Sequence, residues 1–301
     1  MKFQNYRTED FIQDRTLTYE YENDGRAVVE LQWDMFKRCE LDSGSLAELK
    51  AHCDEREVVF FSTPTSAEGV AELAGLGAPL LKNGSDFLTN IPLVEAMARS
   101  GIPTVLSTGM ATAGDIDDSV RAFRAAGGTE LILLQCTSRY PTPPADVNLR
   151  QIDSLGRTFG CPVGFSDHTE GVVAAAAAVA LGACFVEKHF SLDRSLPGPD
   201  HRFSMDPAEL GQLVAAVRTA EQALGHSEIG PTRDEEASRA SYRLSCVAAR
   251  DLEAGSVIDQ DAIAFARPGT GMPPKGARWI AGRTLARAVP AGQPFAPEDL
   301  A

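Results

Sequence analysis

The 301-residue sequence lacks long apolar runs and lacks any cysteine framework. Its longest apolar stretch, 171–186, is rich in alanine and shorter than the ~20 residues that a membrane-spanning helix needs. The six cysteines are scattered without a CxxC pair, and three of them lie in or beside apolar runs. This spacing indicates buried, reduced thiols rather than disulfides. No basic segment with a small-residue cleavage site opens the chain, so we expect a cytoplasmic protein that does not bind membranes.

Positive charge is also scarce, because 28 Lys and Arg face 42 Asp and Glu, for a formal net charge of −14. A nucleic acid needs clustered Lys and Arg to meet its phosphates, so this balance excludes nucleic acid as a partner. An anionic small substrate stays compatible with it, since a few cations inside a pocket are enough. The simplest role of the remaining acid is solubility.

What the sequence does contain, from about residue 57, is a regular alternation of short apolar runs and helix-like segments. The runs are 58–62, 79–82, 104–107, 131–136, 163–166 and 184–189, and the helix candidates are 66–76, 93–100, 113–126, 147–159, 171–181 and 207–224. Strands that alternate with helices predict a parallel sheet. Their nearly continuous apolar character indicates that both faces of the sheet are covered.

Polar residues follow nearly every predicted strand: Thr63, Lys82, Ser85, Ser107, Thr137, Tyr140, Ser166, His168 and His189. A doubly wound sheet would concentrate such residues at one switch point, whereas a (β/α) barrel collects them from all its strands. The pattern therefore predicts a TIM-type α/β barrel over residues 1–225. Counting 2–4 as a strand end gives seven strands, so the barrel lacks its first βα unit.

The remaining sequence changes character. Residues 226–241 are polar, without apolar periodicity, and are interpreted as a linker. Residues 242–301 hold short β-like runs at 246–249 and 262–266 with many Gly and Pro, which predicts a small, mostly β domain. At about 60 residues its stability alone is marginal, so we expect it to pack on a partner surface.

Two histidines suggest a metal site. His168 and His189 end consecutive strands, and neighbouring strands lie about 4.8 Å apart, so both imidazoles can reach one divalent ion. Coordination positions left open would serve a Lewis acid. The alternative, two buried histidines that are merely hydrogen-bonded, stays open.

Lys82 and the hydroxyls of Thr63, Ser85, Ser107 and Ser166 suit a ligand that carries a phosphate and a carboxylate. Helix capping is the alternative for each hydroxyl taken singly, but it does not explain their repetition on five strands. Lys188 offers a rival chemistry, because a buried strand-end lysine can form a Schiff base. Arg267, in a Pro/Gly turn, is either a site residue or an ordinary surface arginine.

Taken together, these segments resemble the N-acetylneuraminate (sialic acid) synthases and their legionaminic and pseudaminic relatives. The matching segments are KFQ (2–4), MFKRCEL (35–41), FSTP (61–64), KNGSDFLTNIPL (82–93), LSTGM (106–110), QCTSRYPTP (135–143), GFSDHT (164–169), VEKHF (186–190) and PGPDHRFSM (197–205). The tail, with RPGTG at 267–271, resembles the antifreeze-like SAF domain that ends these enzymes.

The resemblance implies roles for individual residues. His168 and His189 would bind Mn²⁺ or Mg²⁺ and, with Lys82, act in catalysis. Phosphoenolpyruvate would be held by Lys2, Thr63, Lys82, Ser85, Ser107 and Ser166; the sugar would face Gln4, Tyr140 and Asp200; Ser138 replaces a substrate-binding Asn. Arg267 would reach the barrel of the second protomer in a domain-swapped homodimer.

The implied reaction is the condensation of phosphoenolpyruvate with an N-acetylmannosamine-type aldehyde, with release of phosphate. Two departures from the family pattern matter: the first βα unit, which carries an acidic residue, is absent, and Phe87 stands where relatives carry an acid. The alternatives are an impaired, truncated homologue that serves only as an assembly partner, and a Schiff-base lyase that uses Lys188. We expect the chain as given to be less stable and less active than one extended upstream by the missing unit.

Overall fold

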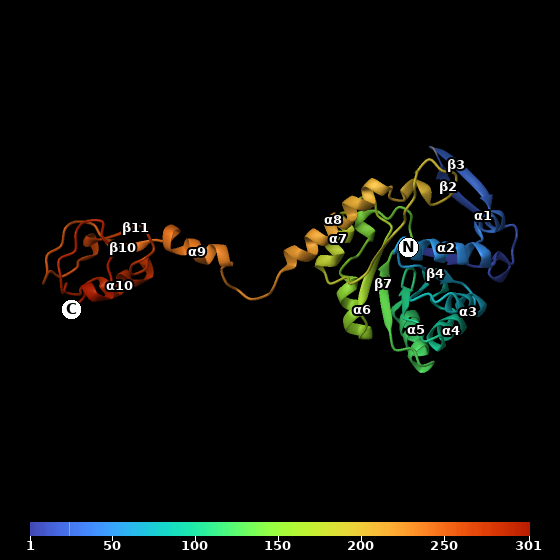
Figure 1. Ribbon diagram of the computed structural model, residues 1–301, viewed down its shortest axis with the longest axis horizontal. Helices are drawn as coiled ribbons and strands as arrows, with labels where there is room; N and C mark the ends of the chain where they lie inside the picture. Colours follow the sequence, from blue (N-terminus) through green and yellow to red (C-terminus); the bar gives the residue numbers. More distant parts are fainter. Residues whose placement is uncertain (24) are drawn as a thin grey trace. The chain divides into compact units, whose positions relative to one another are not determined.

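The computed structural model describes residues 1–23 and 25–301 and divides into two compact units, Met1–Gly225 and His226–Ala301. The first unit is built on a curled, parallel sheet of seven strands (Figure 1). In spatial order these are β1 (Lys2–Asn5), β4 (Phe61–Pro64), β5 (Leu81–Asn83), β6 (Thr104–Ser107), β7 (Leu131–Cys136), β8 (Val163–Asp167) and β9 (Val186–Lys188). The predicted TIM-type fold with seven strands is confirmed.

The first and last strands of this sheet do not pair. Within the described residues, every ladder joins consecutive members of the order, and none joins β1 to β9. A closed barrel has no free strand edges, whereas this sheet has two. We call the gap between β1 and β9 the seam.

Helices cover the outside of the sheet: α2 (Ser43–Glu55), α3 (Ala67–Gly75), α4 (Ile91–Arg99), α5 (Ala113–Ala125), α6 (Gln151–Phe159), α7 (Val173–Ala180) and α8 (Pro207–Leu224). Their starts follow local chemistry, as Thr112 and Asp206 cap α5 and α8 in capping boxes with Asp115 and Glu209. The helix predicted from 147 begins at Gln151 instead, because a short 3-10 turn over Pro144–Asp146 precedes it.

The layer between sheet and helices forms the core. Phe123, Leu133 and Phe165 are almost fully buried where α4 to α7 cover the later strands, and Phe60, Leu73 and Leu81 are buried beneath the earlier helices. This packing explains why the strands are apolar along most of their length. Polar side chains are left for the strand ends and the barrel interior.

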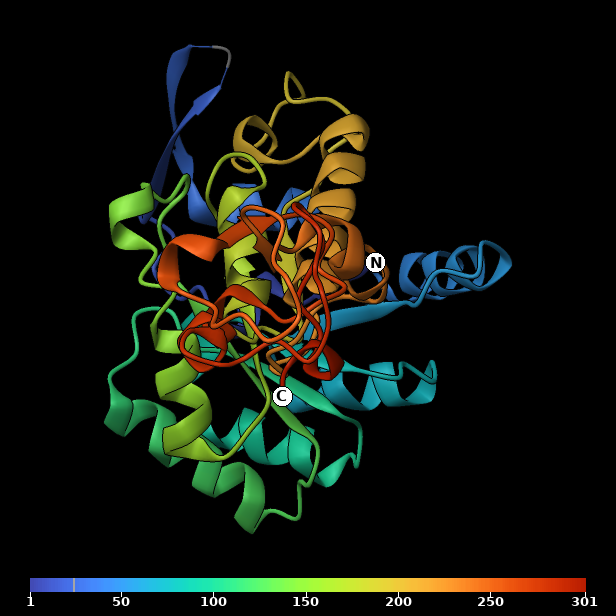
Figure 2. The same ribbon diagram turned by 90° about the vertical axis from the view of Figure 1, so that its left-hand side faces the viewer.

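Residues 5–57 form helices and strands that the sequence pattern did not predict. They form a hairpin of β2 (Thr18–Asn23) and β3 (Arg26–Leu31), followed by α1 (Gln32–Cys39) and α2. The hairpin projects from the barrel (Figures 1 and 2). An ion pair of 3.2 Å between Glu22 and Arg202 ties it to the segment that precedes α8.

The second unit has its own small core. Strands β10 (Ser245–Ala248) and β11 (Ile263–Ala266) pair antiparallel, and α10 (Ala277–Ile280) is short. Buried apolar residues include Leu252, Ile258, Val289 and Phe295. This mostly β unit agrees with the predicted fold class.

Two expectations need correction. Most of the predicted linker 226–241 is helical, since α9 spans Arg233–Tyr242. A capping box of Thr232 and Glu235 starts this helix, and none of its residues is buried, so it leaves no apolar stripe in the sequence. Of the six cysteines, which are all free, Cys39 and Cys184 are exposed rather than buried. No helix in residues 1–23 and 25–301 is both long and apolar enough to cross a membrane.

Candidate active site

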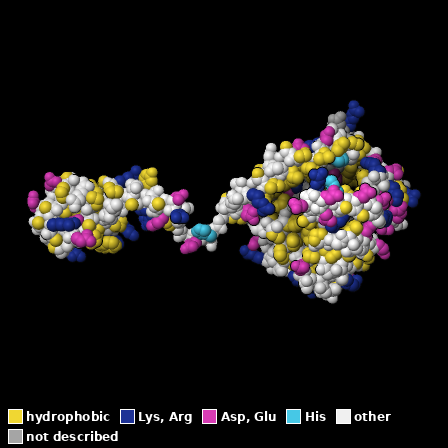
Figure 3. All heavy atoms as spheres, viewed as in Figure 1, with side chains coloured by type: hydrophobic (Ala, Val, Ile, Leu, Met, Phe, Trp, Pro, Cys, Tyr) yellow, Lys and Arg dark blue, Asp and Glu magenta, His cyan; other side chains and the backbone are white. Residues whose placement is uncertain are grey.

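Most of the predicted site residues of the first unit lie at or near the carboxyl ends of the strands; Lys2, which begins β1, is the exception. Strands β1, β4, β5, β6 and β8 carry Lys2, Thr63, Lys82, Ser107 and Ser166 respectively. Because the strands are parallel, their carboxyl ends meet at one rim. On this unit, Figure 3 shows a hollow with basic, acidic and histidine side chains around it.

Lys82 is the centre of the polar contacts. Only 2% of the residue is exposed. Its Nζ donates to Ser107 Oγ at 2.6 Å and to the carbonyl of Asn83 at 2.9 Å, and it lies 3.3 Å from Glu187 Oε2. Burial lowers the pKa of this ammonium, while the Glu187 carboxylate acts in the opposite direction. Lys82 is therefore a cation whose charge depends on its neighbours.

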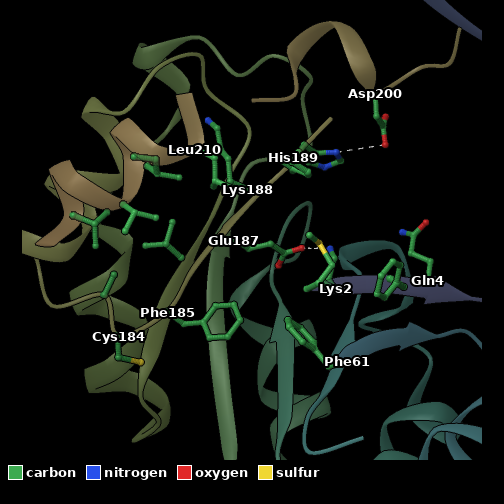
Figure 4. Close-up of a pocket in the computed structure, with 18 of the residues that line it drawn as sticks. Lys2, Gln4, Phe61, Cys184, Phe185, Glu187, Lys188, His189, Asp200 and Leu210 are labelled. Atoms are coloured by element: carbon green, nitrogen blue, oxygen red, sulfur yellow. Dashed lines mark hydrogen bonds and ion pairs between the residues drawn. The ribbon is translucent and has the colours of Figure 1, made fainter. Parts of the chain in front are cut away.

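Glu187 was not predicted as a site residue. Its carboxylate also forms an ion pair with Lys2 across the seam (Figure 4). Burial alone would raise the pKa of Glu187, but Lys82 and Lys2 outweigh it and hold that pKa at about 2. Side chains alternate along a strand, so Glu187 shares the face of β9 that His189 continues. That alternation was the signal available in the sequence.

Two serine hydroxyls meet near Gly109. The backbone N–H of Gly109 donates to Ser85 Oγ at 3.0 Å. A Cβ built at Gly109 would lie 2.7 Å from Ser85 Oγ and would collide with Ser138 Oγ. A side chain here would displace both serine hydroxyls, so the glycine lets the loops after β5 and β7 bring their hydroxyls to the backbone N–H of the loop after β6. This agrees with a site for a small oxyanion.

His168 and His189 lie with their ring centroids 5.4 Å apart. His168 Nδ1 donates to the Thr137 carbonyl at 2.8 Å, which leaves Nε2 as the ring's acceptor, 3.4 Å from Ser166 Oγ. His189 Nδ1 lies 3.4 Å from a carboxylate oxygen of Asp200 (Figure 4). Burial, with a smaller effect from His168, lowers the pKa of His189 to about 3, so this ring is neutral at pH 7.

This pair fits a divalent metal. Metal-binding imidazoles are neutral, and an oxygen partner on the second ring nitrogen orients each of them, as Thr137 and Asp200 do here. Within the described part of the chain, no cluster of three His, Cys, Asp or Glu forms a fuller site. A metal would therefore take two protein ligands and fill its other positions with water or substrate oxygens.

An aromatic wall borders the histidines. The Tyr140 ring lies 4.1 Å from the His168 ring and 5.2 Å from Phe203, which in turn lies 5.2 Å from His189. Phe203 was not predicted, although it belongs to the quoted segment 197–205. Aromatic faces of this kind suit the apolar parts of a ligand.

A cavity of about 880 Å³ connects the rim to the seam. Lys2, Gln4, Glu187, His189 and Asp200 line its polar end. The other end runs between β1 and α8, where apolar side chains line it: Phe3, Phe61, Phe185, Leu213 and Val217. The predicted sugar-facing residues Gln4 and Asp200 thus share one cavity, with Lys2 beside them.

Three other residues make their contacts outside this cluster. Lys188 is on the opposite face of β9, 4% exposed, in an ion pair of 3.0 Å with Asp167. Phe87, at a position where the resemblance implies an acid, packs edge-on against Phe11 with centroids 5.9 Å apart. Arg267 belongs to the second unit, where its Nε donates to the Tyr242 carbonyl at 3.0 Å.

Comparisons with known proteins place this geometry in a family. Residues 1–229 match the NeuB family, and residues 245–301 match the SAF domain. The sequence is 35% identical over 296 residues to the N,N'-diacetyllegionaminic acid synthase of Legionella pneumophila, which covers 97% of this chain and 83% of the relative.

Comparison with solved structures points to the same family. The N-acetylneuraminic acid (sialic acid) synthetase of Leptospira borgpetersenii superposes with a TM-score of 0.70 at 32% identity, over 79% of this chain and 78% of that one. A putative spore coat polysaccharide biosynthesis protein E of Chromobacterium violaceum gives 0.76 at 28% identity, over 100% and 88%. The chain therefore belongs to the NeuB family, carries a C-terminal SAF domain, and is an enzyme of the sialic acid synthase type.

Proposed function

We propose that the protein condenses phosphoenolpyruvate with an N-acetylmannosamine-type sugar aldehyde, releasing phosphate and forming a nonulosonic acid. One observation carries the proposal: a buried lysine, Lys82, and a partly buried one, Lys2, lie near two histidines whose second nitrogens are held by oxygens. This reaction needs an anion-binding site next to a pair of metal ligands. We call the anion-binding site around Lys2 and Lys82 the anion seat. The similarity to named nonulosonate synthases supports the same reaction.

The anion seat suits phosphoenolpyruvate, which carries both a phosphate and a carboxylate. Lys2 and Lys82 supply the charge, and hydroxyls supply further donors: Thr63, Ser85, Ser107, Ser138 and Ser166. Ammonium groups serve as point charges and hydroxyls donate without bulk. Lys82 is already fixed by Ser107 and Asn83, so the seat is preorganised for its anion.

His168 and His189 would hold Mn²⁺ or Mg²⁺. When bound, such an ion would act as a Lewis acid toward an aldehyde oxygen. Thr137 and Asp200 fix the orientation of the two rings, and the low pKa of His189 keeps that ring in its ligand form.

The sugar would lie over Tyr140 and Phe203, with Gln4 and Asp200 as polar partners. In the reaction, C3 of phosphoenolpyruvate forms a bond to the aldehyde carbon, whose oxygen takes a proton. Water adds at C2, and phosphate leaves with its electron pair. Arg267 of a second protomer, in a domain-swapped homodimer, would donate to the sugar's N-acyl oxygen.

The Schiff-base alternative lacks structural support. Its nucleophile, Lys188, is buried on the far face of β9 and its ammonium is engaged by Asp167 and by the Thr169 carbonyl. A Schiff base needs a neutral amine that a carbonyl substrate can reach. Although Lys188 borders the cavity, its Nζ is held by Asp167 and Thr169 and is not directed at a substrate carbonyl.

The test is phosphate release measured with both substrates, with EDTA, and with Mn²⁺ added back. We expect release only when phosphoenolpyruvate and sugar are both present, abolished by EDTA and restored by Mn²⁺. Borohydride should trap no adduct at Lys188. Activity that resists EDTA, together with an adduct at Lys188, would overturn the proposal in favour of the lyase.

A further inference from the structure

Glu187 is a buried carboxylate to which the proposed reaction gives no role. Its side chain is 12% exposed and lies between two lysines, of which Lys82 is 3% and Lys2 is 25% exposed. Its Oε2 is buried and makes no hydrogen bond among the described residues; the 3.3 Å approach of Lys82 is an ion pair. A charge kept in such a place needs an explanation, because burying it is costly.

Lys82 depends on this carboxylate for its charge. Its two hydrogen-bond acceptors, Ser107 Oγ and the Asn83 carbonyl, are neutral. A buried ammonium without a counter-ion loses several kcal/mol of solvation, so it gives up its proton instead. A neutral Lys82 would no longer attract an anion.

Lys2 depends on the same carboxylate for its position. It lies on the edge strand β1, next to the chain's first residue, and its long side chain crosses the seam to Glu187 on β9. Within the described residues no backbone ladder fixes β1 against β9. The ion pair therefore holds a flexible cation in the place where the anion seat needs it (Figure 4).

We propose that Glu187 is a positioning residue for the anionic substrate: it keeps Lys82 charged and holds Lys2 across the seam. The inference rests on the proposed function, since it takes phosphoenolpyruvate as the anion. The opposing effect is the repulsion between Glu187 and that anion. It is the smaller effect, because loss of Glu187 removes the charge of one lysine and the placement of the other.

The proposal predicts a pH dependence that simple repulsion does not. The charged or titratable groups that face Lys82 are Glu187 on β9, Lys2 on β1, Cys136 on β7 and Asp86 after β5, with the Ser107 hydroxyl on β6. In Glu187→Gln, Lys82 loses the carboxylate that opposes the effect of burial, so its pKa falls further and it carries less charge as the pH rises. The binding defect should therefore be larger at pH 8.5 than at pH 6.5.

The experiment is isothermal titration of phosphoenolpyruvate into the full-length wild-type protein and its variants at both pH values. We expect Glu187→Gln to weaken binding tenfold or more at pH 8.5 and less at pH 6.5, with the KM of the sugar changed less than twofold. Glu187→Asp keeps the charge but is one methylene shorter, so it should be intermediate. Glu130→Gln removes an exposed charge at the far end of β7 and is the matched control, expected within twofold of wild type.

The outcomes separate the two claims. Wild-type protein that binds no phosphoenolpyruvate overturns the proposed function and this inference together. Wild-type binding with equal or tighter binding by Glu187→Gln overturns the inference alone. If circular dichroism shows that Glu187→Gln is unfolded, Glu187→Asp decides: unchanged affinity overturns the inference, and weaker binding at an unchanged KM for the sugar supports it.

Discussion

At the scale of single residues, the alternation of side chains along β8 and β9 determines on which face of the sheet each buried charge finds its partner. Ser166 pairs in register with Glu187, and Asp167 pairs with Lys188. One residue of each strand therefore points to the barrel interior and the next points to the helix layer. Ser166 and Glu187 point to the barrel interior, where the candidate site lies. Asp167 and Lys188 point to the helix layer, where they form an ion pair. Neighbouring residues of β9 thus form ion pairs on opposite faces of the strand, Glu187 with Lys82 and Lys188 with Asp167.

Protonation of His189 should make the free energy of unfolding depend on pH. Its folded-state pKa of about 3 lies below the ordinary value near 6.5, so the unfolded chain binds the proton first as the pH falls. The contribution of His189 to the free energy of unfolding is fully present above about pH 7 and is lost steadily below pH 6.5. In EDTA, the unfolding free energy of wild type should drop about 2 kcal/mol more than that of His189→Gln between pH 7 and pH 4.5. Urea melts at the two pH values measure it, and parallel losses in both proteins would contradict the pKa shift.

Sequence reasoning found the residues whose position follows from the strand pattern. Lys82, Ser107 and Ser166 end the predicted strands, and the structure places each of them at the last or the penultimate position of its strand. Glu187 and Phe203 were missed because their importance comes from partners on distant segments, namely Lys2 and Lys82 for the first and Tyr140 for the second. A single strand or loop in the sequence does not reveal such pairings.

At the scale of elements, the repeating strands and helices were predictable, because their apolar periodicity is imposed by the core. The hairpin of β2 and β3 was not, since it projects from the barrel and contributes few buried side chains. Helix α9 was missed for the same reason: no residue of it is buried. Periodicity reports burial, so an element without a buried face leaves little trace.

The edge strands make a further prediction. Among the described strands, β6 and β7 have neighbours on both sides, whereas β1 and β9 each have one. Backbone amides that face the seam have no ladder partner among these strands, so they should open with little free energy. Hydrogen exchange followed by mass spectrometry should show peptides over 1–6 and 184–190 exchanging at least tenfold faster than those over 104–107 and 131–136. Equal protection in all four would show that the seam is closed in solution.

At the scale of the whole molecule, the residues of the proposed function are divided between two units, with the anion seat and the histidines in one and Arg267 in the other. A two-fold dimer in which each second unit serves the partner's barrel would build two equal sites. In such a dimer, no single chain contains a complete site. Assembly would then be part of catalysis.

Mixing variants tests this arrangement. Arg267→Ala should raise the KM of the sugar at least tenfold with little change for phosphoenolpyruvate, and His168→Ala should be inactive. Refolding the two together should restore up to about a quarter of wild-type activity, because half the dimers are mixed and each carries one intact site. Arg267→Ala refolded with itself is the control. Failure to complement, or a monomer by light scattering, would refute the swapped assembly.

The central claim is that one carbon–carbon bond forms between phosphoenolpyruvate and a sugar aldehyde at the rim that Lys82, His168 and His189 share. The most direct measurement uses [3-¹³C]phosphoenolpyruvate, N-acetylmannosamine-type sugars and Mn²⁺, followed by ¹³C NMR and a phosphate assay. The account predicts that the labelled vinyl carbon becomes a CH₂ coupled into a nine-carbon keto acid, with one phosphate released per bond formed, and that none of this occurs with Lys82→Met. Phosphate released with the label appearing in free pyruvate, or full product formation by Lys82→Met, would contradict it.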